Sequence, residues 1–180
     1  MVLARLRLGR RAISRSCLSA DLPWSDIDIV VGLDILRQTS LTIDYERSKV
    51  VFGGPSVSQA SASLDNEEGL LVVPVTLDDL TVRLAVNTGA HLTAVYSKSV
   101  NSWEKRAIAE RRVKVARSGG FVTARQITLR SMEIAGRRIS RPSLAILETE
   151  NSSTKIDGVL AIVGLKRIHF DFERHILSVQ

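Results

Sequence analysis

Residues 84–95 read Leu84-Ala85-Val86-Asn87-Thr88-Gly89-Ala90-His91-Leu92-Thr93-Ala94-Val95. Val82, Leu84 and Val86 alternate with Arg83 and Ala85, which is the period-two pattern of a half-buried β-strand. A short turn containing a glycine follows, and a second apolar run begins directly after it. The stretch therefore predicts two strands joined by a tight turn that starts with the polar side chain of Asn87.

Composition bounds what the rest of the chain can be. Its 180 residues are 44% hydrophobic but only 4% aromatic, so the core must consist of Val, Leu, Ile and Ala. No apolar run approaches the roughly 18 residues that a membrane-spanning helix needs. The net charge is +6, but the basic residues are dispersed and lack interleaved aromatic residues. We expect a solvated basic surface, with no membrane span and no nucleic-acid partner.

The N-terminal residues 1–20 are rich in arginine and serine and contain no acidic residue. Such a composition suits a mitochondrial presequence, and the stretch lacks the continuous apolar core of a secretory signal. The repeat described below favours a folded hairpin instead. The compartment therefore stays unknown, and the single Cys17 excludes only an internal disulfide.

Alternating apolar residues and intervening turns predict β-hairpins along most of the chain. Helical spacing is found only in short stretches, of which residues 99–111 fit best. Residues 53–68 are rich in Ser, Gly, Ala and Asp without periodicity, which indicates a linker. The expected hairpins lie at residues 3–20, 41–52, 70–86, 113–125 and 168–179, and the short helices at 33–38, 99–111 and 162–167.

Three segments recur in the same order, which indicates an internal duplication. The longest match relates residues 8–15, Leu-Gly-Arg-Arg-Ala-Ile-Ser-Arg, to residues 134–141, Ile-Ala-Gly-Arg-Arg-Ile-Ser-Arg. Residues 27–32 match residues 156–161, and residues 43–47 match residues 170–174. The second copy has a preceding half that contains the Asn87 turn, whereas the first copy begins at its back half. The sequence therefore predicts one and a half copies of a β unit.

The order of these motifs resembles the retropepsin-like aspartic proteases, particularly bacterial proteins with two lobes in tandem. A strand enters an Asp-Thr-Gly-like turn, a glycine-rich hairpin follows, and an Ile-Asp-Gly segment precedes a final hairpin. The resemblance implies an all-β fold, a closed or orthogonal barrel-like sandwich with one or two short helices. It divides the chain into the C-terminal half of a first lobe (1–53), a linker (54–68) and a complete lobe (69–180).

In the family, each lobe gives one carboxylate, and the two carboxylates, about 3 Å apart, share one proton. Asn87 stands at the position of that aspartate, and its amide does not titrate, so it can neither accept nor donate the catalytic proton. Ala161 also replaces an expected glycine. By resemblance, Thr88 hydrogen-bonds across the lobe interface and Gly89 permits close backbone approach. The implied peptide-binding positions are Ala90 in the turn and Ser118, Gly119 and Gly120 at the tip of a flap hairpin.

We therefore expect an aspartic endopeptidase relative without activity, a pseudoenzyme. A non-catalytic module that binds an extended peptide under the hairpin is the alternative. The partner is then a peptide or protein, and the chain forms a homodimer or a lobe-swapped dimer. Asn87 read alone is also compatible with a plain turn residue, and one sequence does not distinguish a natural from an engineered replacement.

The other polar residues favour structural roles. His91, His169 and His175 lack metal-ligand spacing, so we expect no metal site and no cofactor. The carboxylates that recur at matched positions are interpreted as loop-capping acids rather than catalysts. They are Asp28, Asp44, Asp157 and Asp171.

Overall fold

The described residues fold mostly as β-strands, which confirms the predicted all-β class. A computed structural model describes residues 2–8, 11–17, 31–54, 60–97, 105–117, 120–148, 155–162 and 164–180. Within these residues the single α-helix is α1 (Leu33–Leu36). It is one turn long and buries only Ile35.

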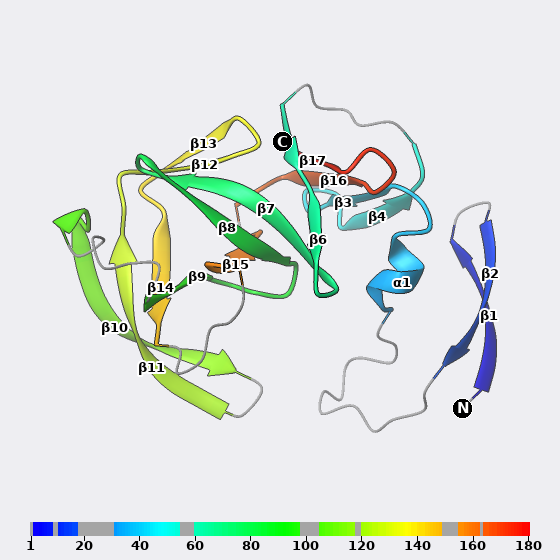
Figure 1. The fold of residues 1–180 in the computed structure, drawn as a ribbon, viewed down its shortest axis with the longest axis horizontal. Helices are drawn as coiled ribbons and strands as arrows, with labels where there is room; N and C mark the ends of the chain where they lie inside the picture. The colour runs from blue at the N-terminus through cyan, green and yellow to red at the C-terminus, as the bar shows by residue number, and fades with distance from the viewer. Residues whose placement is uncertain are drawn as a thin grey trace.

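A ten-stranded sheet holds most of the core (Figure 1). Its strands run in the order β10-β11-β14-β9-β15-β8-β7-β12-β13, and β6 pairs with the β7 strand. Along β7 and β8 the apolar side chains alternate inward, so that Val73, Val75 and Leu84 are fully buried. Each such side chain contributes about 1.5–3 kcal/mol of hydrophobic stabilisation. The strands are β6 (Asp65–Glu67), β7 (Leu70–Leu77), β8 (Leu80–Asn87), β9 (Thr93–Tyr96), β10 (Ala109–Arg117), β11 (Gly120–Thr128), β12 (Ser131–Ile134), β13 (Arg137–Ser140), β14 (Ser143–Leu147) and β15 (Gly158–Ala161).

The β15 strand lies between β8 and β9, parallel to the first and antiparallel to the second. This position requires glycine at residue 158. A Cβ atom there would overlap the carbonyl oxygen of Ala94 and lie 2.8 Å from Val95 Cα. Asp157 fixes the entry to β15, because its Oδ2 accepts a hydrogen bond from Arg83 N at 2.8 Å and its own N donates to Arg83 O.

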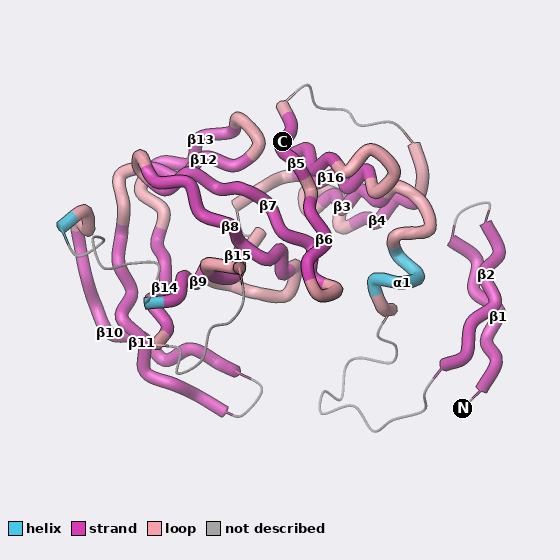
Figure 2. The backbone as a smooth tube through the Cα atoms, viewed as in Figure 1, coloured by secondary structure: helices cyan, strands magenta, loops and turns pink. Residues whose placement is uncertain are grey.

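A second sheet joins an N-terminal hairpin to the C-terminal hairpin of the chain. Its order is β4-β3-β16-β17-β5, so the hairpin of β3 and β4 pairs with the C-terminal hairpin of β16 and β17 (Figure 2). The contact between them is the antiparallel pair β3–β16, in which Thr42 lies opposite His169. The strands are β3 (Leu41–Asp44), β4 (Lys49–Phe52), β5 (Ser61–Ser63), β16 (Arg167–Asp171) and β17 (Ile176–Val179).

The N-terminal hairpin forms a two-stranded sheet of β1 (Val2–Leu8) and β2 (Arg11–Cys17). Its register pairs Leu8 with Arg11. The hairpin of β12 and β13 pairs Ile134 with Arg137, and it continues into the large sheet because β12 also pairs with β7. Among the described residues, β1 and β2 pair only with each other.

Several local expectations need correction. Residues 109–111, expected at the end of a helix, instead begin β10, because the ladder to β11 outweighs a weak helical pattern. Residues 162–167 were expected to form a second short helix, but Arg167 begins β16 and the described residues before it form a turn. The linker range 54–68 contains β5 and β6, which find backbone partners in β17 and β7. Residues 27–30 and 98–104 lie outside the described part of the chain.

Candidate functional site

The Asn87 turn closes the end of β8, where the sequence placed it. Asn87 Oδ1 accepts a hydrogen bond from Gly89 N at 2.9 Å, and Ala90 N donates to Asn87 O at 3.3 Å. The amide side chain is therefore folded back onto its own turn, as asparagine commonly does. Asn87, Thr88 and Gly89 are exposed and Ala90 is half-buried, so the turn faces the outside of this chain.

A buried threonine fixes the position of the turn. Thr93 opens β9 directly after the turn, and its Oγ1 accepts a hydrogen bond from Ala161 N at 3.0 Å. Thr93 Oγ1 also lies 3.5 Å from Ala161 O, to which it can donate. In the parallel register Ala161 stands opposite Asn87. The ends of β8, β9 and β15 are thus tied together at one place, and the exposed turn projects from a rigid base.

Among the described residues, no contact requires glycine at position 89. A Cβ atom there would lie 3.5 Å from Asn87 Oδ1, which is an ordinary contact. The close-approach role expected for Gly89, and the role of Thr88 across a lobe interface, both concern a partner that is not part of this chain. They stay predictions.

The expected flap corresponds to the hairpin of β10 and β11. Its two strands pair from Ala109 with Thr128 to Arg117 with Gly120, at the end where the hairpin turns. Ser118 and Gly119 lie outside the described residues, so the tip itself is not tested, while Gly120 is the first residue of β11. In Figure 1 this end of the hairpin lies at the lower edge of the ten-stranded sheet, below the loop between β8 and β9. Phe121, next to that end, is 76% exposed.

Sequence reasoning missed the roles of Thr93 and Gly158. For Thr93, the only hint in the sequence was a polar residue inside the apolar run that follows the turn. The close approach of β15 to β9 gives no local signal, because it depends on two segments distant in sequence. By contrast, the loop-capping interpretation of the carboxylates is confirmed for Asp44 and Asp171, which accept hydrogen bonds from the backbone N of Arg47 and Arg174. Asp157 instead accepts from Arg83 N on the distant strand β8, so it joins two strands. Asp28 lies outside the described residues.

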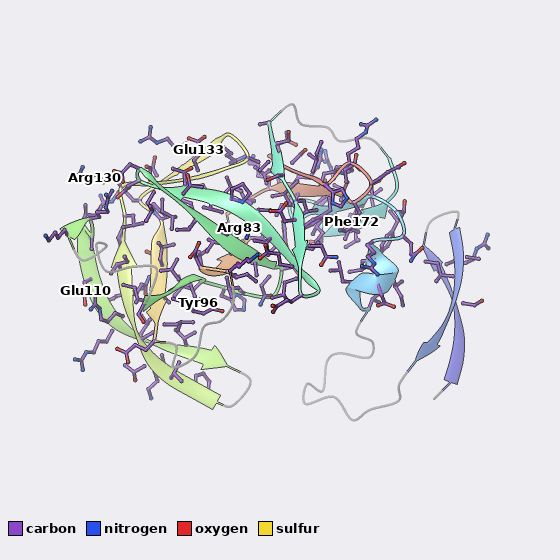
Figure 3. All side chains as sticks on the ribbon, in the orientation of Figure 1. Arg83, Tyr96, Glu110, Arg130, Glu133 and Phe172 are labelled. Carbon is purple, nitrogen blue, oxygen red and sulfur yellow. The ribbon has the colours of Figure 1, made fainter. Side chains whose placement is uncertain are left out.

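The charged residues near this base are engaged in structural ion pairs. Arg83, on β8, reaches β6, where it contacts Asp65 at 2.9 Å and Glu67 at 2.6 Å (Figure 3). Those two acids raise the pKa of the Arg83 guanidinium, with Glu67 the larger cause. Arg83 is therefore a fixed cation that joins two strands, and it is not free to act on a ligand at the turn.

The described residues show neither a metal site nor a helix that could cross a membrane. No group of three or more His, Cys, Asp and Glu side chains among them could hold a metal ion. No described helix has the length and apolar character needed to cross a membrane.

Comparisons with known proteins identify the class. The aspartyl protease family matches residues 73–162, which is half of the chain and includes the Asn87 turn, Thr93 and all of β15. The chain belongs to the aspartyl protease family. No curated protein sequence matches it. Among solved structures, it is similar to a retropepsin-like aspartic protease from Rickettsia conorii, with 16% identity, 66% of this chain and 87% of the other covered, and a TM-score of 0.46.

Proposed function

We propose that this chain is a hydrolytically inactive aspartyl protease relative, with Asn87 at the position where the family carries its catalytic aspartate. The observation that carries this proposal is the placement of Asn87. It stands at the exposed start of a turn inside the family match, above the Thr93–Ala161 base. Its side chain accepts a hydrogen bond from Gly89 N, as a carboxylate oxygen at that position would.

The chemistry of the family explains the loss of activity. Peptide hydrolysis by two carboxylates needs one ionised group to take a proton from water and one protonated group to donate to the scissile carbonyl. An amide can do neither, because it does not titrate. A homodimer or lobe-swapped dimer would bring two Asn87 side chains together, and the site would still lack a carboxylate.

The substitution Asn87→Asp tests the proposal directly. An unfolded protein substrate is incubated at pH 4–6 with the unaltered chain, with Asn87→Asp, and with Asn66→Asp as a matched control on the exposed face of β6. We expect cleavage only with Asn87→Asp, and block of that cleavage by an inhibitor of aspartic proteases. Because each copy supplies one carboxylate, the rate should rise with the square of the protein concentration.

Inhibitor-sensitive cleavage by the unaltered chain would refute inactivity. Absence of cleavage by Asn87→Asp at every concentration would favour the second candidate function, a module that binds an extended peptide without cutting it. One structural observation supports that candidate. β10 is a terminal strand of the ten-stranded sheet, and beside it Phe121 exposes most of its ring.

A peptide could add to the β10 edge as a further strand and cover Phe121. We expect Phe121→Ser to weaken peptide binding relative to the unaltered chain, whereas Leu70→Ser, at another exposed hydrophobic residue, leaves it unchanged. Fluorescence anisotropy with an unstructured peptide measures both. Binding that disappears at high salt would instead point to the basic surface, since exposed charges are screened.

A further inference from the structure

A pocket of about 380 Å³ lies beside the turn between β7 and β8. This volume is near the lower end of the roughly 300–1,000 Å³ that small-molecule sites occupy. Three parts of the chain place basic side chains in its wall, and Figure 3 shows one of them, Arg130, beside this turn. The four cations are Lys105 and Arg106 before β10, Arg130 between β11 and β12, and Arg138 on β13.

Backbone hydrogen bonds hold the base of this pocket in place. Asp78, in the turn between β7 and β8, donates its N–H to Ser131 O at 3.0 Å, and its Oδ1 accepts from Ser131 N at 2.9 Å. On the neighbouring residue, Arg130 O accepts a hydrogen bond from Arg141 N at 3.0 Å. The backbone that carries Arg130 is therefore fixed before any ligand enters, and binding needs to order only side chains.

The charges in the wall are unbalanced. Four cations against two carboxylates leave the wall with a net charge of +2. Asp79 forms an ion pair with Arg106, and Asp78 uses Oδ1 for the Ser131 backbone. Three of the four cations make no ion pair with any described residue. They are Lys105, Arg130 and Arg138.

A carboxylate stands close to one of these cations without pairing with it. Glu133 lies directly opposite Arg138 in the β12–β13 register, yet no ion pair joins their side chains within the described residues. Arg83 shows the contrast, because it holds both Asp65 and Glu67 on β6. The cations of the pocket are thus left available for an anion that is not part of the chain.

The number and direction of the cations define the anion. A carboxylate offers two oxygen atoms, whereas a phosphomonoester offers three terminal oxygens and carries a charge of about −1.5 to −2 at pH 7. Guanidinium groups bind such oxygens through two parallel charge-assisted hydrogen bonds. We propose that this pocket binds a small phosphomonoester, with Lys105, Arg130 and Arg138 around the terminal oxygens of its phosphate group.

The remaining wall restricts the rest of the ligand. No aromatic side chain among the described residues lines the pocket, so a nucleobase would find no ring on which to stack. The pocket is larger than one phosphate group, which leaves room for a small polar group esterified to it. A compact phosphate ester therefore fits better than a nucleotide.

The pocket is remote from the Asn87 turn. β8 begins at Leu80, next to the pocket, and ends at Asn87. Seven steps along a strand span about 23 Å at roughly 3.3 Å each. Binding at the pocket is therefore an additional property, and it does not depend on whether the Asn87 turn supports hydrolysis.

Calorimetric titration of the full chain with glycerol 3-phosphate tests the site, at constant ionic strength and about pH 7.5, where the phosphate is mostly dianionic. We expect one molecule to bind per chain, about tenfold or more tighter than acetate, because it accepts more charge-assisted hydrogen bonds. Arg130→Gln and Arg138→Gln should each weaken binding about tenfold. Arg112→Gln, at an exposed position of β10 outside the pocket, should leave it unchanged.

A fourth variant should act in the opposite direction. Asp79→Asn removes the carboxylate that pairs with Arg106, so the net charge of the wall rises and a fourth cation becomes available. We expect binding to tighten about two- to fivefold, the range that an exposed charge pair supports. A damaged fold does not produce tighter binding, and circular dichroism checks that each variant remains folded.

Vesicles distinguish the two sources of a phosphomonoester. Phosphatidic acid presents this group on a lipid, whereas phosphatidylserine is an anionic lipid without it. Vesicle binding that requires phosphatidic acid and both Arg130 and Arg138 would assign the site to a lipid headgroup, and binding of glycerol 3-phosphate alone would assign it to a free molecule.

Two results would overturn the proposed site. One is the absence of binding to both glycerol 3-phosphate and phosphatidic acid. The other is equal weakening by Arg112→Gln, Arg130→Gln and Arg138→Gln, which would indicate a diffuse basic surface. None of these measurements uses peptide cleavage, so the pocket and the proposed loss of catalysis can fail separately.

Discussion

Arg167 Nη2 donates a hydrogen bond to Asp44 Oδ2 at 2.7 Å and joins two strands that lie 123 residues apart in the sequence. Asp44 is 6% exposed and also receives hydrogen bonds from the Arg47 backbone N at 3.0 Å and the Arg47 side chain at 3.1 Å. This carboxylate connects the hairpin of β3 and β4 to the C-terminal hairpin of β16 and β17 at the centre of the five-stranded sheet.

The Asp44 cluster predicts a loss of stability in strong acid. The hydrogen bond from Arg167 is the largest cause that lowers the pKa of Asp44 from 3.8 to about 2. As pH falls below 3.8 the unfolded state takes up the proton first, so the stabilisation present above pH 3.8 is lost by about pH 2. Denaturant unfolding between pH 2 and 5 should show that the free energy of unfolding falls as the pH falls. Asp44→Asn should make this dependence on pH weaker. Asp171→Asn, whose carboxylate binds the Arg174 N of its own turn, should keep most of it.

His169 predicts a second pH dependence nearer neutrality. Its side chain is buried, and its Nε2 has no hydrogen-bond partner among the described residues. Burial lowers the pKa of His169 below 6.5, so the unfolded state binds a proton that the folded state does not. The free energy of unfolding should fall as pH decreases from about 7 through 6.5. His169→Phe should remove this slope, whereas His175→Asn, at an exposed position, should retain it. An identical slope in His169→Phe would contradict the prediction.

Gly158→Ala should destabilise the protein by about 1–3 kcal/mol, because the added methyl group overlaps backbone atoms of β9 that cannot move independently. Gly89→Ala is the matched change in the turn, where the methyl group meets only an ordinary contact. That variant should remain within about 0.5 kcal/mol of the unaltered chain. Urea unfolding measures both changes in stability, provided that the slope of the unfolding free energy against urea concentration stays the same. Equal effects of the two substitutions would show that β15 does not approach β9 this closely.

Thr93→Val should cost about 1–3 kcal/mol although it preserves the shape of the side chain, because Ala161 N then loses the hydroxyl that accepts its hydrogen bond. Thr81→Val provides the control on the exposed face of β8, where the hydroxyl group contacts only Thr76 at 3.3 Å. A neutral result for Thr93→Val would mean that the base under the Asn87 turn does not depend on this contact.

The sequence by itself determined the β class, the positions of most hairpins and the place of Asn87 at the end of a strand. Period-two alternation and turn residues are local, so each hairpin could be predicted from its own residues. The family follows from the order of motifs within residues 73–162, a length over which the sequence pattern is specific.

Only the tertiary structure decided how distant segments meet. The insertion of β15 between β8 and β9, the Thr93–Ala161 hydrogen bonds and the Asp44–Arg167 pair all join residues at least 63 positions apart. The strand that begins at Ala109 was mistaken for a helix end for the same reason, since its hydrogen bonds go to β11. Backbone N–H and C=O groups in a sheet form hydrogen bonds with neighbouring strands, and the local sequence pattern does not determine which strand becomes the neighbour.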